Sequence, residues 1–222
     1  MVVAGLQKTS LVDYPGQIAS TVFVGGCNFQ CPYCHNKTLL NNGRPHISMD
    51  DVLSHLNERK HFTDSVVVTG GEPTLYEKLP DVLALMKSYG LRVKLDTNGS
   101  RPEMLSLLLA HNLLDYIAMD IKAPLHKYNA VCGTSVDEAA LRESIHIIKT
   151  TKHYEFRTTV IPDIHTEEDI HDIIASLLNG DAKKYALQRY KPQPDFLQKG
   201  WTAADWRKFC DAFSEYSFIT SR

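Results

Sequence analysis

The sequence lacks a long hydrophobic run and has no low-complexity stretch. Its most apolar stretch, residues 105–114, is interrupted by His111 and Asn112 and is much shorter than the roughly 20 residues that a membrane-spanning helix needs. The first sixteen residues contain Lys8 and Asp13 where the apolar part of a secretory signal peptide would lie. We therefore expect no membrane-spanning helix, no membrane partner and a location in the cytoplasm.

Charge of one sign is also missing. Lys and Arg total 24 against 26 Asp and Glu, so the net charge is -2, and the charges are scattered along the chain. Nucleic-acid binders usually carry a basic block or stripe, so we expect no nucleic-acid partner. With 222 residues, of which 43% are hydrophobic, the chain can bury one core but is too short for two catalytic domains. We predict a single domain over residues 1–222.

Cysteine is sparse, and the number of cysteines is odd. Cys27, Cys31 and Cys34 lie close together among the 5 cysteines, whereas Cys132 and Cys210 stand alone. A disulfide framework would have an even number at regular spacings and would need an oxidising compartment. The grouping predicts a metal site, and it leaves Cys132 and Cys210 without a predicted role.

Short apolar runs rich in Val and Ile alternate with longer amphipathic segments about six times. This alternation is typical of strand–helix units that form a parallel sheet. Since a closed eight-stranded barrel usually needs about 250 residues, we predict an α/β fold, a partial (β/α)6 TIM-like barrel. The expected strands are residues 18–24, 65–69, 91–96, 116–121, 154–161 and 185–190.

Most of the expected helices begin with a side-chain oxygen that can cap free backbone N–H groups. In parallel barrels the functional groups follow the carboxyl ends of the strands, so we expect the site in the segments that lead into these helices. The expected starts are Ser48 before residues 49–60, Thr74 for a segment that ends near Gly90, capping boxes at residues 100–103 and 135–138, and Thr166 and Thr202 for the last two helices.

The three grouped cysteines read Cys-x3-Cys-x2-Cys and follow the first expected strand and a Gly-Gly pair. One alternative is three small hydrophobic side chains on a buried helix face, but the glycines and Pro32 favour an irregular loop. Another is a zinc site with His35 as the fourth ligand, although adjacent Cys34 and His35 would point apart. Three thiolates suit a four-iron cluster whose fourth iron has no protein ligand.

Residues 26–36 read Gly-Cys-Asn-Phe-Gln-Cys-Pro-Tyr-Cys-His-Asn. This segment closely resembles the cluster loop of the radical S-adenosylmethionine (SAM) enzymes. Its Cys-His-Asn ending, and Ser-Leu-Val-Asp-Tyr-Pro-Gly at residues 10–16, resemble the glycyl-radical-enzyme activases. Among these, the chain is most similar to the anaerobic ribonucleoside-triphosphate reductase activating proteins, over nearly its whole length.

The resemblance implies the type of barrel, the cofactors and the reaction. It implies a partial barrel of the radical SAM type and a 4Fe-4S cluster on Cys27, Cys31 and Cys34. The open iron would be chelated by SAM, and the reduced cluster would cleave SAM to a 5′-deoxyadenosyl radical. Such a cofactor is needed because no side-chain acid or base can take hydrogen from an unactivated C–H bond.

By the same resemblance, Gly71 and Glu72 hold the methionine ammonium group of SAM. They lie in Thr-Gly-Gly-Glu-Pro at the end of the second expected strand. Glycines let a backbone come close to a ligand, and a carboxylate can bind an ammonium group; an ordinary strand-to-helix turn is the alternative. Asp96 and Asn98 end the third strand and resemble the ribose-side motif of the activases, although Asn98 also begins a common Asn-Gly turn.

Asp120 and Lys122 end the fourth expected strand. The resemblance places Lys122 near the carboxylate of SAM and lets Asp120 help to hold a monovalent cation. Residues two apart on a strand share a face, so we expect both to form a polar group with Asp96; a structural ion pair is the alternative. The resemblance also places Arg157 near SAM and Tyr33 beside the adenine, where a simple ion pair and an exposed tyrosine are the alternatives.

These features predict a radical SAM activase that forms a glycyl radical on a partner enzyme. The resemblance indicates the large subunit of anaerobic ribonucleotide reductase as that partner and a flavodoxin or ferredoxin as the reductant. Two other classes stay open. One is a radical SAM enzyme that acts on a small molecule, like the deazaguanine synthases, and the other is a non-enzymatic zinc or iron-sulfur module.

Overall fold

Eight strands form the sheet of the computed structural model, which describes residues 1–40, 47–193, 196 and 198–222. The strands follow one another in the sheet in chain order. Their bounds are Val3–Ser10 (β1), Ala19–Val24 (β2), Ser65–Gly70 (β3), Arg92–Thr97 (β4), Tyr116–Asp120 (β5), Tyr154–Val160 (β6), Tyr185–Arg189 (β7) and Ile219–Ser221 (β8).

Helices connect most of these strands. Among the described residues, no helix has the length and the apolar character that crossing a membrane requires. The α-helices are Lys37–Leu40 (α1), Met49–Arg59 (α2), Leu79–Ser88 (α3), Pro102–Ala110 (α4), Leu125–Cys132 (α5), Glu138–Lys149 (α6), Glu167–Asp172 (α7) and Ala203–Asp211 (α8), with a 3-10 helix at Pro73–Leu75 (η1) and a π-helix at Ile173–Leu177 (η2).

The chain divides into two compact units. The first comprises Met1–Asn28 and Asn36–Ala118, and the second comprises Phe29–His35 and Met119–Arg222. The cysteine segment therefore contributes Cys27 to the first unit and Cys31 and Cys34 to the second. The expectation of a single domain over residues 1–222 stays a prediction.

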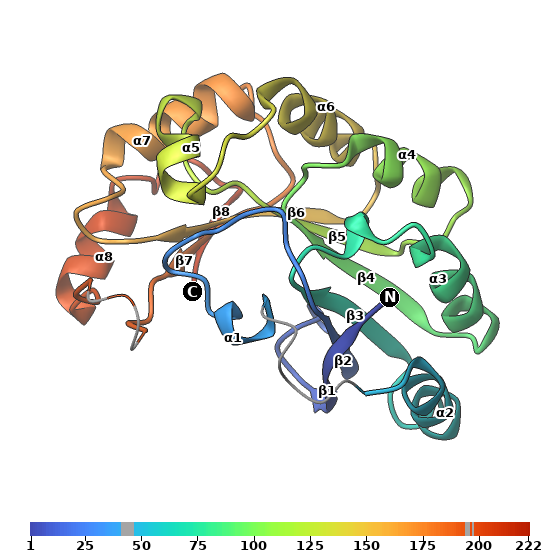
Figure 1. Cartoon of the computed structure of the whole chain (residues 1–222). Helices are drawn as coiled ribbons and strands as arrows, with labels where there is room; N and C mark the ends of the chain where they lie inside the picture. The colour runs from blue at the N-terminus through green and yellow to red at the C-terminus, as the bar shows by residue number, and fades with distance from the viewer. Residues whose placement is uncertain (41–46, 194–195, 197) are drawn as a thin grey trace. The chain divides into compact units, whose positions relative to one another are not determined.

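In the first unit, β1 pairs antiparallel with β2, and β2, β3 and β4 are parallel. The central strand β3 is built from Val66, Val67 and Val68, which are all fully buried. β-branched side chains favour extended backbone and fill a strand that is covered on both faces. Helices α2, α3 and α4 lie along one side of these strands (Figure 1). Because β2, β3 and β4 are parallel, their carboxyl ends lie at one common edge.

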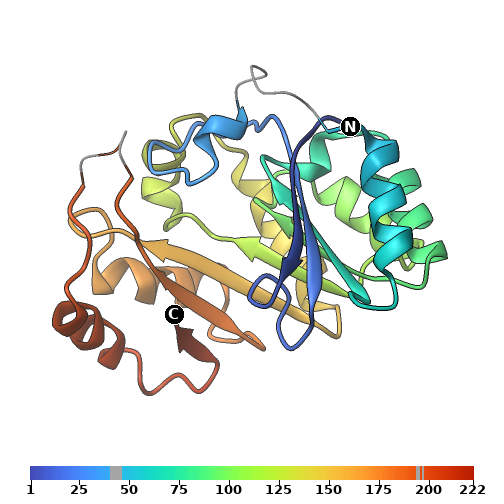
Figure 2. The ribbon, with the colours of Figure 1, turned by 90° about the horizontal axis from the view of Figure 1, so that it is seen from below.

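In the second unit, β6, β7 and β8 are parallel neighbours. Figure 2 shows these three strands side by side, with α8 in the segment that leads into β8. The hydroxyls of Thr158 and Tyr185 meet at 2.7 Å in the buried face between β6 and β7. The unit also holds the last residues of β5, so the ends of β5 and β6 lie in one body.

The predicted alternation of six strands with helices is confirmed, and the six expected strands are β2 to β7 within two residues at each end. The short helix α1 was not predicted, and neither were β1, β8 and α5. β1 is half-exposed over most of its length, β8 has only three residues, and α5 lacks a clear apolar period in its sequence Leu-His-Lys-Tyr-Asn-Ala-Val-Cys.

The predicted helix starts at Ser48, Thr166 and Thr202 are confirmed, since each side-chain oxygen accepts a hydrogen bond from a backbone N–H of the first turn. The capping boxes at residues 100–103 and 135–138 are wrong. Helix α4 begins after Arg101 without a side-chain cap, and Asp137 caps α6. The hydroxyl of Ser100 instead accepts a hydrogen bond from the side-chain amide of Asn28, at 2.9 Å.

The predicted start of the next helix at Thr74 is also wrong. The segment opens with η1, which the Glu72 carboxylate caps, and α3 begins only at Leu79. Pro80 lies in the first turn of α3. Proline has no backbone N–H, and the N–H groups of the first helical turn have no partner within the helix, so a proline there favours a new helix start.

The carboxylate of Glu155 in β6 is buried and is held by Arg222, with Nη2 to Oε1 at 3.0 Å, and by Lys184 at 3.1 Å. Burial alone would raise the pKa of Glu155, but the hydrogen bonds and charge of Arg222 lower it below its usual value. A carboxyl group with a lowered pKa in the folded state stabilises the fold above its ordinary pKa of about 4.3, and this contribution is lost as the pH falls.

We predict that Arg222→Ala lowers the free energy of unfolding by about 1–3 kcal/mol at pH 7, the usual range for a hydrogen bond to a charged group. Between pH 5 and pH 3 the variant should lose less stability than the wild type does. Urea unfolding at several pH values measures both effects, and Arg207→Ala, which removes an exposed arginine of α8, is the matched control. Equal curves for the wild type and Arg222→Ala would contradict the prediction.

Candidate functional site

Two glycines at the end of β3 bring its backbone against the start of the cysteine segment. The N–H of Gly71 donates to Val24 O at 2.8 Å, and the N–H of Glu72 donates to Gly26 O at 2.9 Å. A Cβ atom on Gly71 would lie 1.7 Å from Gly26 O, a distance that no side chain tolerates. Gly71 is therefore required by the packing of the first unit, whether or not it contacts a ligand.

Glu72 is fully buried, and both carboxylate oxygens are hydrogen-bonded. Oε1 accepts from Thr74 N at 3.1 Å, Thr74 Oγ1 at 2.5 Å and Thr97 Oγ1 at 2.8 Å, and Oε2 accepts from Asn98 N at 2.6 Å. Burial raises the pKa of Glu72, and the hydrogen bonds partly oppose this shift. The carboxylate thus ties the end of β3 to the end of β4, which is a structural role beside the proposed binding of SAM.

Asn98 connects the end of β4 with Cys27. Its side-chain Nδ2 lies 3.8 Å from the sulfur of Cys27 and donates to Asn28 Oδ1 at 2.9 Å. Asn98 is buried, and its Oδ1 accepts from the backbone N–H of Ser100. The Asn-Gly turn that was an alternative for Asn98 is thus present, and the same side chain also orients the first cysteine.

Asp96 pairs with Lys94, which lies two residues earlier on β4 and is 1% exposed. The sequence reasoning missed Lys94. A lysine within an apolar strand, two residues before an aspartate and hence on the same face, is the signal that could have found it. The pair places a charged carboxylate at the carboxyl end of β4.

In the second unit, the sulfur of Cys31 is buried and lies beside the thiol of Cys132. A hydrogen bond from Cys132 and the positive charge of Lys122 outweigh the effect of burial and lower the pKa of Cys31 to about 7. A large fraction of Cys31 is therefore thiolate at neutral pH, and the thiolate is the form that binds metals. Cys34 follows in a turn, with its N–H donating to Cys31 O at 3.1 Å.

Tyr33 is buried, which excludes the exposed loop tyrosine that was its alternative. Its hydroxyl lies near Cys31 and Lys122 and finds no hydrogen-bond partner of ordinary geometry among the described residues. The ring packs near Phe196, with 6.3 Å between the ring centres. A buried hydroxyl without a partner is costly, which suggests that a ligand completes its hydrogen bonding.

Asp120, Lys122 and Arg157 form one group at the ends of β5 and β6. Lys122 Nζ lies 2.9 Å from one oxygen of Asp120, and Arg157 Nε lies 2.7 Å from the other. The two cations outweigh burial and hold the pKa of Asp120 well below its usual range, and Asp120 raises the pKa of Lys122 well above its own. The ammonium group of Lys122 and the guanidinium group of Arg157 thus share one carboxylate at the ends of β5 and β6.

The backbone of Lys122 is fixed from both sides. Its N–H donates to the hydroxyl of Tyr128 at 3.2 Å, and its C=O accepts from Nε2 of His165 at 2.9 Å. Nδ1 of His165 accepts from Ile161 N, so Nε2 carries the proton. His165 is 3% exposed, and burial lowers its pKa, so it is neutral. The sequence reasoning missed Tyr128 and His165 because nothing in their local pattern indicates these contacts.

We predict that His165→Phe, which removes both hydrogen bonds but keeps a ring, lowers the free energy of unfolding by about 1–3 kcal/mol per buried group left without a partner. A base with a lowered pKa makes the fold less stable as the pH falls below its ordinary value of 6.5, and the variant should lack this loss. SAM affinity should fall because Lys122 loses its anchor. Chemical denaturation at pH 7.5 and pH 5.5 and a SAM titration measure these effects. Exposed His153→Phe is the control, and a variant that behaves like it would refute the prediction.

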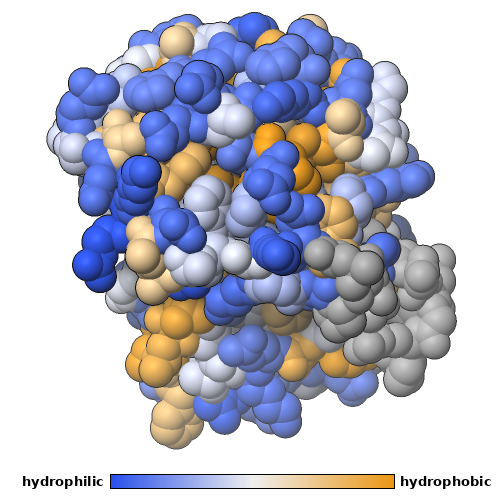
Figure 3. Space-filling model, turned by 90° about the vertical axis from the view of Figure 1, so that its left-hand side faces the viewer, coloured by the Kyte–Doolittle hydropathy of each residue, from blue (hydrophilic) through white to orange (hydrophobic). Residues whose placement is uncertain are grey.

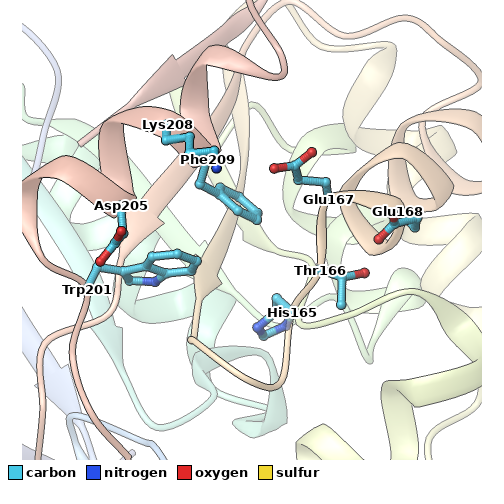
Figure 4. Close-up of a pocket in the computed structure, with 8 residues that line it drawn as sticks. All are labelled: His165, Thr166, Glu167, Glu168, Trp201, Asp205, Lys208 and Phe209. Atoms are coloured by element: carbon cyan, nitrogen blue, oxygen red, sulfur yellow. The ribbon is translucent and has the colours of Figure 1, made fainter.

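A cavity of about 550 Å³ opens between the starts of α7 and α8 in the second unit. Figure 4 shows Trp201 and Phe209 on one side of it and Glu167 and Glu168 on the other. The side of the molecule that carries α8 is mostly hydrophilic, with small apolar groups (Figure 3). None of the predicted site residues lines the cavity. The residues that line it are His165, Thr166, Glu167, Glu168, Trp201, Asp205, Lys208 and Phe209.

The donor chemistry of the cysteine segment fits an iron-sulfur cluster. All five cysteines lie in the described ranges, and none of them forms a disulfide. In those ranges, no three Cys, His, Asp or Glu side chains are arranged to hold one metal ion. A four-iron cluster makes a different demand, because each thiolate binds its own iron. The lowered pKa of Cys31 and the buried hydroxyl of Tyr33 agree with a group bound at this segment.

A family model described as the radical SAM superfamily matches residues 21–177, which span β2 to η2 and every predicted site residue. The chain therefore belongs to the radical SAM superfamily. Membership implies an iron-sulfur cluster and SAM as cofactors.

A protein of Methanocaldococcus jannaschii, provisionally named a glycyl-radical enzyme activating enzyme, is 32% identical over 86% of this chain and 80% of its own length. Within the superfamily, the chain thus belongs to the glycyl-radical enzyme activating enzymes. The pyruvate formate-lyase-activating enzyme of Clostridium pasteurianum is 34% identical over 53% of the chain. The anaerobic ribonucleoside-triphosphate reductase-activating protein of Salmonella typhi is 35% identical over 35%. The chain matches only about half the length of these last two proteins, 50% and 52%.

The fold is also found in solved structures. The crystal structure of Streptococcus suis SuiB bound to the precursor peptide SuiA superposes with a TM-score of 0.73, at 15% sequence identity, over 91% of this chain and 48% of that chain. At this identity the likeness shows the fold alone. It confirms the predicted α/β class, a partial TIM-like barrel of the radical SAM type.

Proposed function

We propose that this enzyme forms a glycyl radical on a partner enzyme by reductive cleavage of SAM. The observation that carries the proposal is the segment with Cys27, Cys31 and Cys34, in a chain that shares 32% identity with an activating enzyme over most of its length. A 4Fe-4S cluster on these cysteines would supply the electron that splits SAM into methionine and a 5′-deoxyadenosyl radical, which then takes a hydrogen atom from a glycine Cα.

The residues of the chain would bind and orient SAM. The ammonium group of Lys122, which is held by Asp120 at the end of β5, supports binding of the methionine carboxylate. Glu72 would attract the ammonium group at the close approach made by Gly71, and the adenine would pack on Tyr33 and complete the hydrogen bonding of its hydroxyl.

The remaining contacts concern the ribose and the first cysteine. Asp96 would accept hydrogen bonds from the ribose hydroxyls, since it is a carboxylate at a strand end. Asn98 would keep Cys27 oriented through the contact with its sulfur. A monovalent cation near Asp120 completes the proposal, although it would have to compete with Lys122 for the carboxylate.

For the partner, we propose the large subunit of anaerobic ribonucleotide reductase, with a flavodoxin or ferredoxin as the reductant. The motif at residues 10–16 and the match to the Salmonella typhi protein support this choice, whereas the Clostridium pasteurianum match supports pyruvate formate-lyase. Thiols that must stay reduced fit the cytoplasm.

The test mixes the anaerobically reconstituted and reduced protein with SAM and one candidate partner at a time. Electron paramagnetic resonance should detect an organic radical on the partner, together with one 5′-deoxyadenosine for each radical formed. A partner whose radical-bearing glycine is replaced by alanine is the control. SAM cleavage that yields a modified small molecule and no protein radical would instead favour an enzyme like the deazaguanine synthases. Absence of any 5′-deoxyadenosine would refute both functions.

A further inference from the structure

Lys94 and Asp96 form an ion pair on one face of β4, in the first unit. Residues two apart on a strand share a face, and Lys94 Nζ contacts Oδ1 of Asp96. The lysine side chain is 1% exposed, whereas the aspartate side chain is 15% exposed. The buried cation therefore lies within the strand, and the carboxylate lies closer to its carboxyl end.

An apolar cluster surrounds the position of Lys94. Tyr14, Ala19 and Val67 form a buried group, and Tyr116 packs against it. The ring centres of Tyr14 and Tyr116 are 5.7 Å apart, and Lys94 Nζ lies 6.0 Å from the centre of the Tyr116 ring. Val67 is the register partner of Lys94 on β3. The ammonium group thus lies among aromatic and aliphatic side chains, where a charge without an acidic partner is costly.

The stability of the fold does not by itself explain a lysine at this position. The attraction within a buried ion pair often only offsets the hydration that both charges lose, and apolar side chains of similar volume serve a core as well or better. A methionine at position 94 would have a similar length without that cost. It would not hold the carboxylate of Asp96, which is where the proposed function places the ribose of SAM.

The orientation of Asp96 matters because a carboxylate binds hydroxyl groups through directed hydrogen bonds. A carboxylate that rotates freely has to be ordered when the ligand binds, and this ordering weakens binding. The ion pair to Oδ1 restricts the rotation of Asp96 before SAM arrives. Lys94 thereby prepares the end of β4 for a ligand that it does not itself reach.

We propose that Lys94 is a positioning residue for the ribose of SAM: its ion pair with Asp96 holds the carboxylate in the orientation that binds the ribose hydroxyls. The pair thereby sets the preference of the enzyme for SAM over analogues that lack one of these hydroxyls. The inference rests on the proposed function, because it needs SAM at the carboxyl end of β4.

The experiment measures the binding of SAM and of its 2′-deoxy and 3′-deoxy analogues by calorimetry. The anaerobically reconstituted proteins are used without a reductant, so that SAM is bound and not cleaved. The wild type should bind at least one analogue about tenfold more weakly than SAM, because a hydrogen bond to a charged group is lost. In Lys94→Met this ratio should fall to about threefold or less, because the carboxylate is no longer ordered in advance.

Two further variants test whether Lys94 acts through Asp96. Asp96→Asn should lose the same preference, and Lys94→Met/Asp96→Asn should lose no more than Asp96→Asn alone. The matched control is Lys87→Met, which breaks another lysine–aspartate pair of the first unit. Lys87 Nζ lies 2.7 Å from Asp115, and the two side chains are 30% and 34% exposed. This control should keep the wild-type preference.

The outcomes separate this inference from the proposed function. A wild type that holds no cluster and binds no SAM refutes the proposed function. If the wild type binds SAM, equal affinity for SAM and both analogues overturns the inference. An unchanged ratio in Lys94→Met also overturns it. Lys94→Gln, which keeps a hydrogen-bond donor for Asp96, is the second variant: if only one Lys94 variant folds, its ratio decides, and unfolding of both, seen by circular dichroism, overturns the inference by making Lys94 a part of the core alone.

Discussion

Cys31→Ala should abolish the iron-sulfur cluster and reduce SAM cleavage to background, while the protein stays folded. Cys31 is the buried member of the cysteine segment. Its pKa is lowered to about 7, which favours the thiolate form that binds metals. The cluster would have only three protein ligands, because its fourth iron is left open for SAM. The two ligands that remain after the substitution are too few to hold it. Iron analysis, the visible absorbance of the anaerobic protein and chromatography of 5′-deoxyadenosine measure the effect.

Cys210→Ala is the matched control for this substitution, because it removes a thiol of similar size from α8, outside the cysteine segment. This variant should keep the visible absorbance of the cluster and the SAM cleavage activity. Circular dichroism should show little loss of structure in Cys31→Ala, since the side chain that is removed is small. A Cys31→Ala protein that retains four irons and cleaves SAM would show that the cluster assignment is wrong.

Glu72→Ala should strongly destabilise the protein. Glu72 accepts four hydrogen bonds without contact with solvent, and its loss leaves the backbone N–H groups of Thr74 and Asn98 unsatisfied. At about 1–3 kcal/mol for each buried group left without a partner, the free energy of unfolding should fall by roughly 2–6 kcal/mol. Thermal and urea unfolding measure this loss. Exposed Glu77→Gln in the next segment should have almost no effect.

Glu72→Gln separates the structural role from the binding of SAM. The amide keeps one acceptor oxygen but presents an NH2 group to a backbone donor, so we expect a smaller loss of stability than with alanine. The variant should fold, retain the cluster and bind SAM more weakly, because it has no charge for the ammonium group. Iron analysis beside a SAM titration tests this. Wild-type affinity in Glu72→Gln would leave Glu72 with a structural role alone.

The raised pKa of Glu72 adds a dependence on pH with a defined sign. Burial makes the folded protein bind a proton at Glu72 more readily than the unfolded chain does. The wild type therefore gains stability from this group as the pH falls toward the ordinary carboxyl pKa of 4.5, and glutamine cannot contribute it. The destabilisation caused by Glu72→Gln should accordingly grow as the pH is lowered from 7 toward 4.5, which urea unfolding at several pH values measures.

The sequence predicts the elements whose signals are local. The six central strands were found because runs such as Val66–Val68 are apolar on both faces, and three helix starts because a hydroxyl immediately precedes each helix. β1 was missed because its middle residues are partly exposed and carry no buried pattern. The false capping box at Ser100 shows the limit of such signals, since a distant side chain, Asn28, takes the hydroxyl instead.

For the site, the sequence indicated the residue types but not their internal partners. The pairing of Asp120 with Lys122 follows from a spacing of two on a strand and was expected. The bond from Asn98 to Glu72 joins residues 26 positions apart, and the contact of Cys31 with Cys132 joins residues from different parts of the chain. Contacts of this kind depend on how β-strands and helices come together, which no local pattern encodes.

The close approach of Gly71 to Gly26 has a consequence for how the protein responds to heat. The N–H groups of Gly71 and Glu72 at the end of β3 donate hydrogen bonds to the residues just before Cys27. The backbone that leads to Cys27 is therefore anchored to the sheet. Warming would therefore have to break the hydrogen bonds between the ends of β2 and β3 before the backbone at Gly26 could move away from the sheet.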